Sequence, residues 1–262
     1  MRPLSDAAPD VLAAARFVLC DLDDTLTLDG RLPSISYAAM ENLERSGRRV
    51  VVVTGRPAGW CDLIARFWPV AAVVGENGAF YFRYDREARR MIRRYQRSDE
   101  ERSDDRRRLH ALVDEVRTQH PELVLSADQA YRVSDVAIDF CEDVERLPDG
   151  KIADMVAMLR SGGATVKLSS IHINAWIGSF SKLEMTRVLL AGEFGLGEDE
   201  MAGGQIYVGD SPNDEPMFEY FDNSVGVANI DQFMGLITHP PRWVTSRPGG
   251  FGFAELADLV LA

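Results

Sequence analysis

The strongest evidence for the fold comes from one segment, Phe17-Val18-Leu19-Cys20-Asp21-Leu22-Asp23-Asp24-Thr25. Four consecutive apolar residues predict a short strand that is buried on both faces, as in a parallel sheet. Acidic residues follow directly, at the carboxyl end of that strand. Ligands of open parallel sheets bind outside the carboxyl ends of the strands. The stretch therefore predicts an α/β fold with a functional site at Asp21 and Asp23.

The residues downstream repeat the alternation of strand and helix. A helix is predicted over 34–46, closed by Gly47, and a strand over 50–53 that runs into Thr54-Gly55-Arg56. A further strand over 70–74 precedes Glu76-Asn77-Gly78, whose Asn-Gly pair indicates a turn into another strand. This order is typical of βαβ units, so we expect a doubly wound, mainly parallel, Rossmann-like core.

The composition changes after residue 82. Residues 83–108 are rich in arginine interleaved with acidic residues, which indicates a solvated face or the entry to another domain rather than a nucleic-acid patch. Residues 109–177 then read as an α+β unit with adjacent strands. After Gly178 the first pattern returns, with a helix over 181–191 and a strand over 205–208. We expect a catalytic core from residues 1–82 and 179–262, interrupted by an inserted α+β cap over 83–178.

Length and charge limit the classes of function. The 262 residues suffice for a sizeable core, and 29 basic against 41 acidic residues give a net charge of −12. Such a chain repels phosphate backbones and anionic lipids, so neither nucleic acid nor a membrane is an expected partner. Three scattered cysteines and the absence of a long apolar run predict a cytoplasmic protein. The oligomeric state is left open.

Four acidic residues are predicted to share one crevice. Asp21 and Asp23 follow one strand, and Asp210 and Asp214 follow another. Repulsion among carboxylates is relieved by a cation or by protonation, and Mg²⁺ suits a site that also receives a substrate phosphate. The Asp21 stretch is not a calcium-binding loop, because Leu26 and Leu32 occupy the positions that require glycine and an acid.

Two further motifs suit a phosphoryl group. Thr54 offers a hydroxyl group, with the backbone N–H groups of the Gly55 turn beside it, and Lys182 offers a positive charge. A nucleophilic carboxylate, a second acid, a cation and phosphate clamps are the components of phosphoryl transfer through an aspartyl phosphate.

The four motifs, taken together, resemble those of the haloacid dehalogenase superfamily of phosphohydrolases. The match comprises Asp21-x-Asp23-x-Thr25, Thr54, Lys182 and Gly209-Asp210-x-x-Asn213-Asp214 in the same order. The insertion between Glu76-Asn77-Gly78-Ala79 and Ser181-Lys182 resembles the subgroup with a type IIB cap, which includes Cof-like sugar-phosphate phosphatases.

The resemblance implies a role for each matched residue. Asp21 would attack phosphorus, and Asp23 would protonate the leaving alkoxide and later activate water. Asp21, the backbone carbonyl of Asp23, and Asp210 would hold Mg²⁺, with Asp214 positioning Lys182 or a water. The phosphoryl group would be bound by Thr54, Gly55, Lys182 and Asn213.

Substrate selection is predicted to lie near the cap. Along 171–177 the side chains alternate, so that the isoleucines share one face and His172, Asn174 and Trp176 the other. We expect the polar face to look onto the crevice, with Trp176 as an aromatic platform, and Arg56 and Asn77 to add contacts to the substrate. The other tryptophans, Trp60, Trp68 and Trp243, are expected to be packing residues.

The sequence thus predicts a Mg²⁺-dependent phosphohydrolase for a small phosphorylated metabolite, with a sugar phosphate as the expected class. A phosphomutase related to phosphomannomutase, or a sensor that binds sugar phosphate without catalysis, stays open as an alternative. A receiver-type signalling domain is disfavoured, because it is a single short domain without an insertion.

Overall fold

The computed structural model describes residues 1–262, apart from the side chain of Pro9. The strands are β1 (Arg2–Pro3), β2 (Phe17–Cys20), β3 (Arg49–Val53), β4 (Ala72–Gly75), β5 (Phe80–Asp85), β6 (Arg90–Tyr95), β7 (Val124–Leu125), β8 (Asp135–Asp139), β9 (Thr165–Leu168), β10 (His172–Trp176), β11 (Ile206–Gly209), β12 (Asn223–Gly226) and β13 (Trp243–Val244). The α-helices are α1 (Pro9–Ala13), α2 (Ser34–Arg45), α3 (Ala58–Phe67), α4 (Asp99–Gln119), α5 (Asp149–Ser161), α6 (Lys182–Phe194), α7 (Glu198–Gly204), α8 (Glu215–Tyr220) and α9 (Gly249–Leu261). Short 3₁₀ turns include η2 (Glu76–Gly78), η3 (Gln129–Tyr131) and η4 (Pro212–Asp214).

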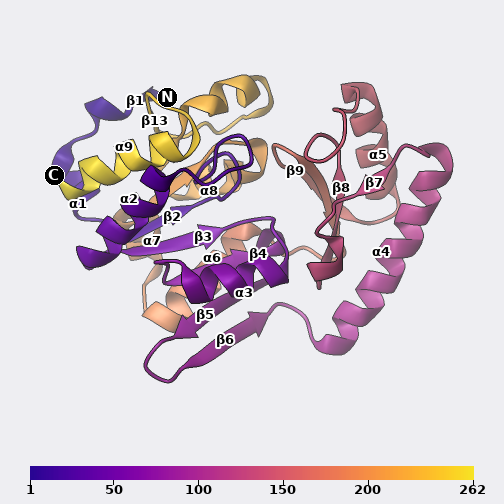
Figure 1. Cartoon of the computed structure of the whole chain (residues 1–262), viewed down its shortest axis with the longest axis horizontal. Coiled ribbons are helices and arrows are strands. Elements are labelled where there is room, and N and C mark those ends of the chain that lie inside the picture. The colour runs from indigo at the N-terminus through magenta and orange to yellow at the C-terminus, as the bar shows by residue number, and fades with distance from the viewer.

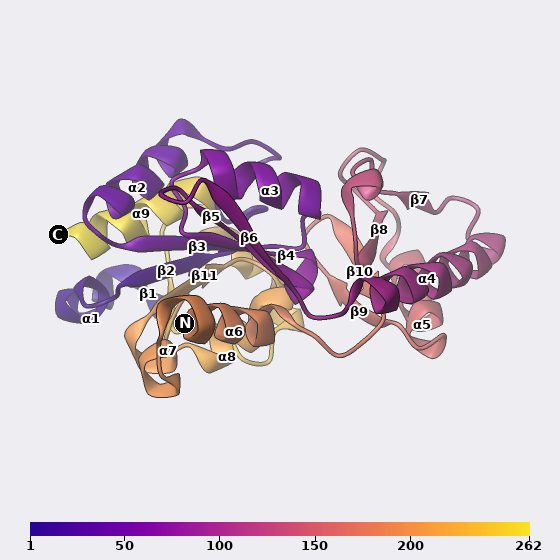
Figure 2. The same ribbon diagram turned by 90° about the horizontal axis from the view of Figure 1, so that it is seen from below.

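A nine-stranded sheet forms the larger part of the molecule, with strand order β1-β13-β12-β11-β2-β3-β4-β5-β6. The strands from β1 to β4 in this order run parallel, and β5 and β6 add an antiparallel edge. Helices α2, α3 and α9 cover one face, and α6, α7 and α8 cover the other (Figures 1 and 2). The predicted doubly wound, mainly parallel core is confirmed.

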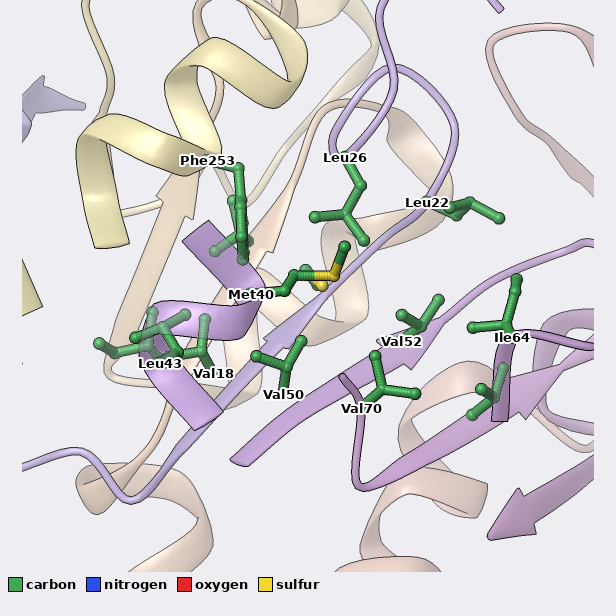
Figure 3. Packing of buried hydrophobic residues seen from close by; sticks show 14 of the residues in the cluster. Val18, Leu22, Leu26, Met40, Leu43, Val50, Val52, Ile64, Val70 and Phe253 are labelled. Atoms are coloured by element: carbon green, nitrogen blue, oxygen red, sulfur yellow. The ribbon is translucent and has the colours of Figure 1, made fainter. Parts of the chain in front are cut away.

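The packing of the sheet explains why its strands read as continuous apolar runs. Side chains alternate between the two faces of a strand. Val18, Val50 and Val52 therefore pack under Met40 of α2 and Phe253 of α9 (Figure 3). Their neighbours along β2 and β3 point the opposite way, into the layer with α6 and α8. Both faces of these strands are buried, as the sequence predicts.

A second sheet, antiparallel and four-stranded, lies beside the carboxyl ends of the first, with order β7-β8-β10-β9. Helices α4 and α5 pack against it. Ile173, Ala175 and Ile177 lie in the hydrophobic cluster under these helices, as predicted for the isoleucine face, whereas Ile171 lies outside the cluster and is half-buried.

Part of the arginine-rich segment belongs to the nine-stranded sheet, although the sequence analysis assigns it to the cap. Both strands of the β5–β6 hairpin pair within the nine-stranded sheet, although the sequence boundary at residue 83 cuts through β5. Arginines on this edge lie over aromatic rings, as Arg93 does over Phe82 at 5.4 Å. An edge hairpin keeps one polar side, so the thinning of apolar residues marks the sheet edge rather than a new domain. We therefore propose 96–178 as the insertion.

The rest of the charged segment forms α4. Ser98 and Glu101 make a capping box, in which each side chain accepts a hydrogen bond from the other residue's backbone N–H. This cap starts the helix at Asp99, well before the apolar spacing that predicts a helix around Leu109. In the described part of the chain, no helix is both long and apolar enough to cross a membrane.

Candidate active site

The sheet register places the four motifs at one edge. Cys20 pairs with Val52 of β3 and with Val208 of β11, so the residues that follow these three strands lie side by side. The backbone N–H of Asp21 donates to the carbonyl of Val208 at 2.9 Å, which continues the pairing into the motif. Residues distant in sequence are thereby brought to the same crevice, as the parallel-sheet argument predicts.

Lys182 lies at the centre of the crevice, at the first turn of α6. Its Nζ donates to Asp21 Oδ1 at 3.0 Å and to Asp214 Oδ1 at 2.8 Å, and all three side chains are buried. Burial alone would lower the pKa of Lys182, but the two carboxylates overcome this effect and raise it. The lysine is therefore a fixed cation beside Asp21.

Three carboxylates face this single ammonium group. Oxygens of Asp21, Asp210 and Asp214 lie within 4.8 Å of one another, and each residue is buried. Burial raises the pKa of Asp21 to about 7, against the opposing effect of Lys182. Burial and the neighbouring carboxylates also raise the pKa of Asp210. The uncompensated negative charge fits a bound divalent cation, for which carboxylate oxygens are suitable ligands.

The hydrogen bonds distinguish Asp214 from the other two carboxylates. Asp214 Oδ1 accepts from Lys182 and from the Tyr207 hydroxyl at 2.6 Å, and its Oδ2 accepts from the N–H groups of Asp210 and Ser211 at 3.1 and 3.3 Å. These donors occupy both oxygens of Asp214. The arrangement favours Asp21 and Asp210 as cation ligands, with Asp214 behind them holding Lys182.

Asp23 faces the cap rather than the buried acid cluster. Arg56 Nε and Nη2 donate to its two oxygens at 2.9 and 2.8 Å. The same guanidinium donates to Asp128 at 3.3 Å and to Glu142 at 3.2 Å, both in the insertion. Arg56 therefore joins the second acid of the first motif to the cap.

The proposed phosphate-binding residues lie on two neighbouring loops. Thr54 is buried, and its hydroxyl accepts from the N–H of Arg56 at 3.0 Å, which shapes the turn at Gly55. Asn213 is buried on η4, where its side-chain oxygen accepts from the Ser211 hydroxyl at 3.0 Å. Both loops follow strands adjacent to β2.

Two buried amides lie against the Gly55 turn. A Cβ atom at Gly55 would lie 3.2 Å from Asn77 Nδ2 and 3.4 Å from Asn174 Oδ1. The side-chain nitrogens of Asn77 and Asn174 have no hydrogen-bond partner among the described residues. Asn77 also has a left-handed backbone, with φ of 56°, which is uncommon outside glycine. These two buried amide nitrogens could donate hydrogen bonds to an oxygen-rich ligand at the Gly55 turn.

The remaining cap residues differ in their surroundings. His172 is buried, and its Nε2 lies 2.9 Å from Glu142 Oε2. Trp176 is only 2% exposed and stacks on Phe180 with ring centroids 5.5 Å apart. Trp176 therefore belongs to the core packing and does not form the predicted open platform, because Phe180 and the core cluster cover its ring.

The contacts between cap and core depend on residues that the sequence analysis did not select. Glu76 accepts hydrogen bonds from the N–H groups of Ala58 in the core and of Val133, Ser134 and Asp135 in the insertion. Arg132 donates to the carbonyl of Gly55 at 2.9 Å and pairs with Asp128 and Asp135. Glu76 lies in the quoted Glu76-Asn77-Gly78-Ala79 motif, but the spacing of neighbouring residues predicts no contact with the insertion for either Glu76 or Arg132.

Comparisons with known proteins agree with this geometry. Residues 18–136 match the family model of haloacid dehalogenase-like hydrolases. No curated protein sequence matches the chain. A crystal structure from Thermoplasma acidophilum is similar at 18% identity, with a TM-score of 0.71 over 94% of this chain and 99% of that one.

Two similar structures carry names that state an activity. A sugar phosphatase of haloacid dehalogenase subclass IIB has 13% identity and a TM-score of 0.59, over 88% of this chain and 93% of that one. The sucrose-phosphatase of Synechocystis, solved with sucrose and phosphate, has 16% identity and a TM-score of 0.61, over 94% and 98%. At these identities the similarity shows the shared fold, which includes the inserted sheet.

Proposed function

Because residues 18–136 match the family model of haloacid dehalogenase-like hydrolases, we propose that the chain is a Mg²⁺-dependent phosphomonoesterase that forms an aspartyl phosphate on Asp21. The observation that carries the proposal is the buried cluster of Lys182 with Asp21, Asp210 and Asp214. A fixed ammonium group beside a buried carboxylate would attract and orient a phosphoryl oxygen.

The reaction would proceed in two steps on this chain's own residues. An Asp21 oxygen would attack phosphorus while the bond to the leaving oxygen breaks. Asp23, once protonated and released from its pairing with Arg56, would give its proton to that oxygen. Asp23 would then take a proton from water as the water attacks phosphorus, which breaks the aspartyl ester and releases phosphate. Lys182, Thr54 and Asn213 would hold the phosphoryl oxygens throughout.

Asp21, Asp210 and the backbone carbonyl of Asp23 would hold Mg²⁺, and the ion would supply charge stabilisation for the phosphoryl group. Asp214 would act through Lys182, since its oxygens already accept four hydrogen bonds. The acid cluster supports this assignment, because its negative charge exceeds what one lysine compensates.

A sugar phosphate is the class to test first. The names of the two similar phosphatases suggest it, and the unpaired nitrogens of Asn77 and Asn174 beside Gly55 suit oxygen-rich substrates. His172 and Glu142, paired at 2.9 Å, add polar groups on the cap side.

The test is phosphate release from a panel of sugar phosphates, phosphoglycolate, nucleotides and pyridoxal phosphate, with Mg²⁺ and with EDTA. We expect Mg²⁺-dependent release by the native chain and none by Asp21→Asn, since an amide is not a competent nucleophile. Isomerised sugar phosphate without free phosphate would indicate a phosphomutase. Binding without turnover of any member would contradict the proposal and favour a sensor.

A further inference from the structure

A cavity of about 540 Å³ lies beside Asp23, at the junction of α3, the loop after β2 and the cap. One end is polar and holds Asp23, Arg56 and Glu142. The walls are mainly apolar and are formed by Leu22, Leu32, Trp60, Leu63, Trp68 and Tyr131. Core and cap both contribute, so the cavity is a product of the domain arrangement.

Several wall residues are far more exposed than large apolar side chains usually are. Trp60 is 41% exposed, Leu63 51% and Tyr131 58%. Trp60 also lies under the Arg56 guanidinium, 4.5 Å from ring centroid to Arg56 Cζ, which fixes its ring beside the polar end. An apolar occupant would remove this surface from water, which is favourable in proportion to the area covered.

The polar end has little capacity left for a ligand rich in hydroxyl groups. Arg56 already donates to Asp23, Asp128 and Glu142, and Glu142 also pairs with His172. The leucine walls offer no hydrogen-bonding atom. A polyol in this cavity would therefore leave most of its hydroxyl groups unpaired, and that is costly.

The chemistry at Asp23 indicates which part of a substrate would occupy the cavity. A general acid must lie within hydrogen-bonding reach of the oxygen that it protonates. The atoms attached to that oxygen must then begin next to Asp23, at the polar end of the cavity. We propose that the leaving group of the preferred substrate carries a flat apolar ring, aromatic or heteroaromatic, which lies in this cavity against Trp60. This inference rests on the proposed phosphomonoesterase activity, and it replaces sugar phosphates with phosphoesters of aromatic alcohols as the expected substrate class.

A protein-docking surface is the competing explanation for the exposed side chains of α3. Phe67 is 73% exposed on the same helix but does not line the cavity. A partner that covered the helix would use Phe67 as well, whereas a leaving group in the cavity would not. Phe67→Ala is therefore a matched control for Trp60→Ala and Leu63→Ala.

The first experiment compares benzyl phosphate with glycerol phosphate, both esters of primary alcohols. We expect the native chain to prefer benzyl phosphate. Trp60→Ala and Leu63→Ala should each lower kcat/KM for benzyl phosphate by about tenfold, because each removes the apolar contact between the ring and one wall of the cavity. Values for glycerol phosphate should change by less than about twofold, and Phe67→Ala should match the native chain on both esters.

Equal losses on both esters, or a native preference for glycerol and hexose phosphates, would overturn the inference while leaving the phosphatase proposal intact. Equal effects of Phe67→Ala and Trp60→Ala would also overturn it, in favour of a docking surface.

A second experiment measures binding without hydrolysis. Titration calorimetry with Mg²⁺ compares benzylphosphonate with methylphosphonate, and we expect the benzyl compound to bind about tenfold more tightly, a difference that Trp60→Ala removes. If the chain hydrolyses no ester but still shows this difference, the proposed function fails and the cavity assignment stands. Equal affinities in the native chain would overturn the assignment.

Discussion

Among single residues, the excess of negative charge around Lys182 affects both cation binding and the stability of the folded protein. One ammonium group lies between Asp21 and Asp214, and Asp210 adds a third buried carboxylate. The negative charge of these carboxylates favours the binding of a cation. Without a cation, the same charge destabilises the folded protein, because buried carboxylates lose their hydration. Function and stability therefore have opposite requirements at Asp21.

This conflict predicts a pH-dependent gain in stability for Asp21→Asn when divalent cations are removed with EDTA. Burial raises the pKa of Asp21 from 3.8 to about 7, so the folded state binds a proton that the unfolded state has already released. Proton binding by Asp21 therefore stabilises the folded native chain at low pH. This contribution to the free energy of unfolding should be lost as pH rises from about 4 to about 7, at roughly 1.4 kcal/mol per pKa unit. Asparagine does not titrate, so the variant should become the more stable of the two near pH 8.

Urea unfolding of both proteins across this pH range measures the difference, and added Mg²⁺ should reverse it by stabilising only the native site. A constant difference between pH 4 and 8 would show that Asp21 is not the buried titrating group.

Asp23→Asn should separate the role of the second acid from that of the nucleophile. We expect turnover of alkyl phosphates to fall by about 10²- to 10⁴-fold, the usual contribution of general acid catalysis. Turnover of p-nitrophenyl phosphate should fall much less, because nitrophenolate leaves without protonation. Steady-state kinetics on both esters measures the contrast, and equal losses would mean that Asp23 acts through geometry or the cation instead.

At the scale of elements, η2 connects the core helix α3 to the segment that leads into β8. Glu76 alone accepts the N–H groups of Ala58, Val133, Ser134 and Asp135. Its backbone adopts φ of 43°, and Gly78 follows so close to the Ser181 carbonyl that a Cβ would lie 2.0 Å from that oxygen. The strained turn is held in place by contacts that arrive from both domains.

Glu76→Ala should therefore destabilise the protein by at least about 3 kcal/mol, because it leaves several buried N–H groups without an acceptor. Chemical denaturation measures the loss. Glu100→Ala, at an exposed position of α4, is the control and should stay within about 0.5 kcal/mol of the native value. A small loss for Glu76→Ala would indicate that water or other acceptors replace the carboxylate.

In the molecule as a whole, two buried arginines connect the insertion to the core. Arg132 of the insertion has a side chain that is 0% exposed, and it pairs with Asp128 and Asp135 while donating to the Gly55 carbonyl of the core. Arg56 of the core forms ion pairs with Asp128 and Glu142 of the insertion. The cap is thus tied to the loop that would bind the phosphoryl group.

We predict that Arg132→Ala lowers the free energy of unfolding by about 3–5 kcal/mol, since it leaves buried carboxylates unpaired. Arg146→Ala removes a pair whose side chains are 59% and 88% exposed, and it should change stability by less than about 1 kcal/mol. Denaturation midpoints compare the two variants. Similar midpoints would mean that the Arg132 pairs are accessible to water.

The parallel core and the four motifs at its edge could be predicted from the amino-acid sequence alone. Apolar runs such as 50–53 report burial on both faces, and the residues after them must gather where parallel strands end. The layout of an inserted α+β unit could also be predicted. The predicted boundary at residue 83 falls inside the edge hairpin β5–β6, because an exposed sheet edge has the composition of a linker.

The surroundings of those motifs depend on how the two domains pack. Arg56, Glu142 and Tyr131 line one cavity with Asp23 because two domains pack together. Trp176 is buried and Trp60 is exposed, which is the reverse of what the sequence predicts for these two tryptophans. Local patterns report which face of an element is buried. They do not report which face of a different domain lies opposite, because that depends on long-range packing rather than on the spacing of neighbouring residues.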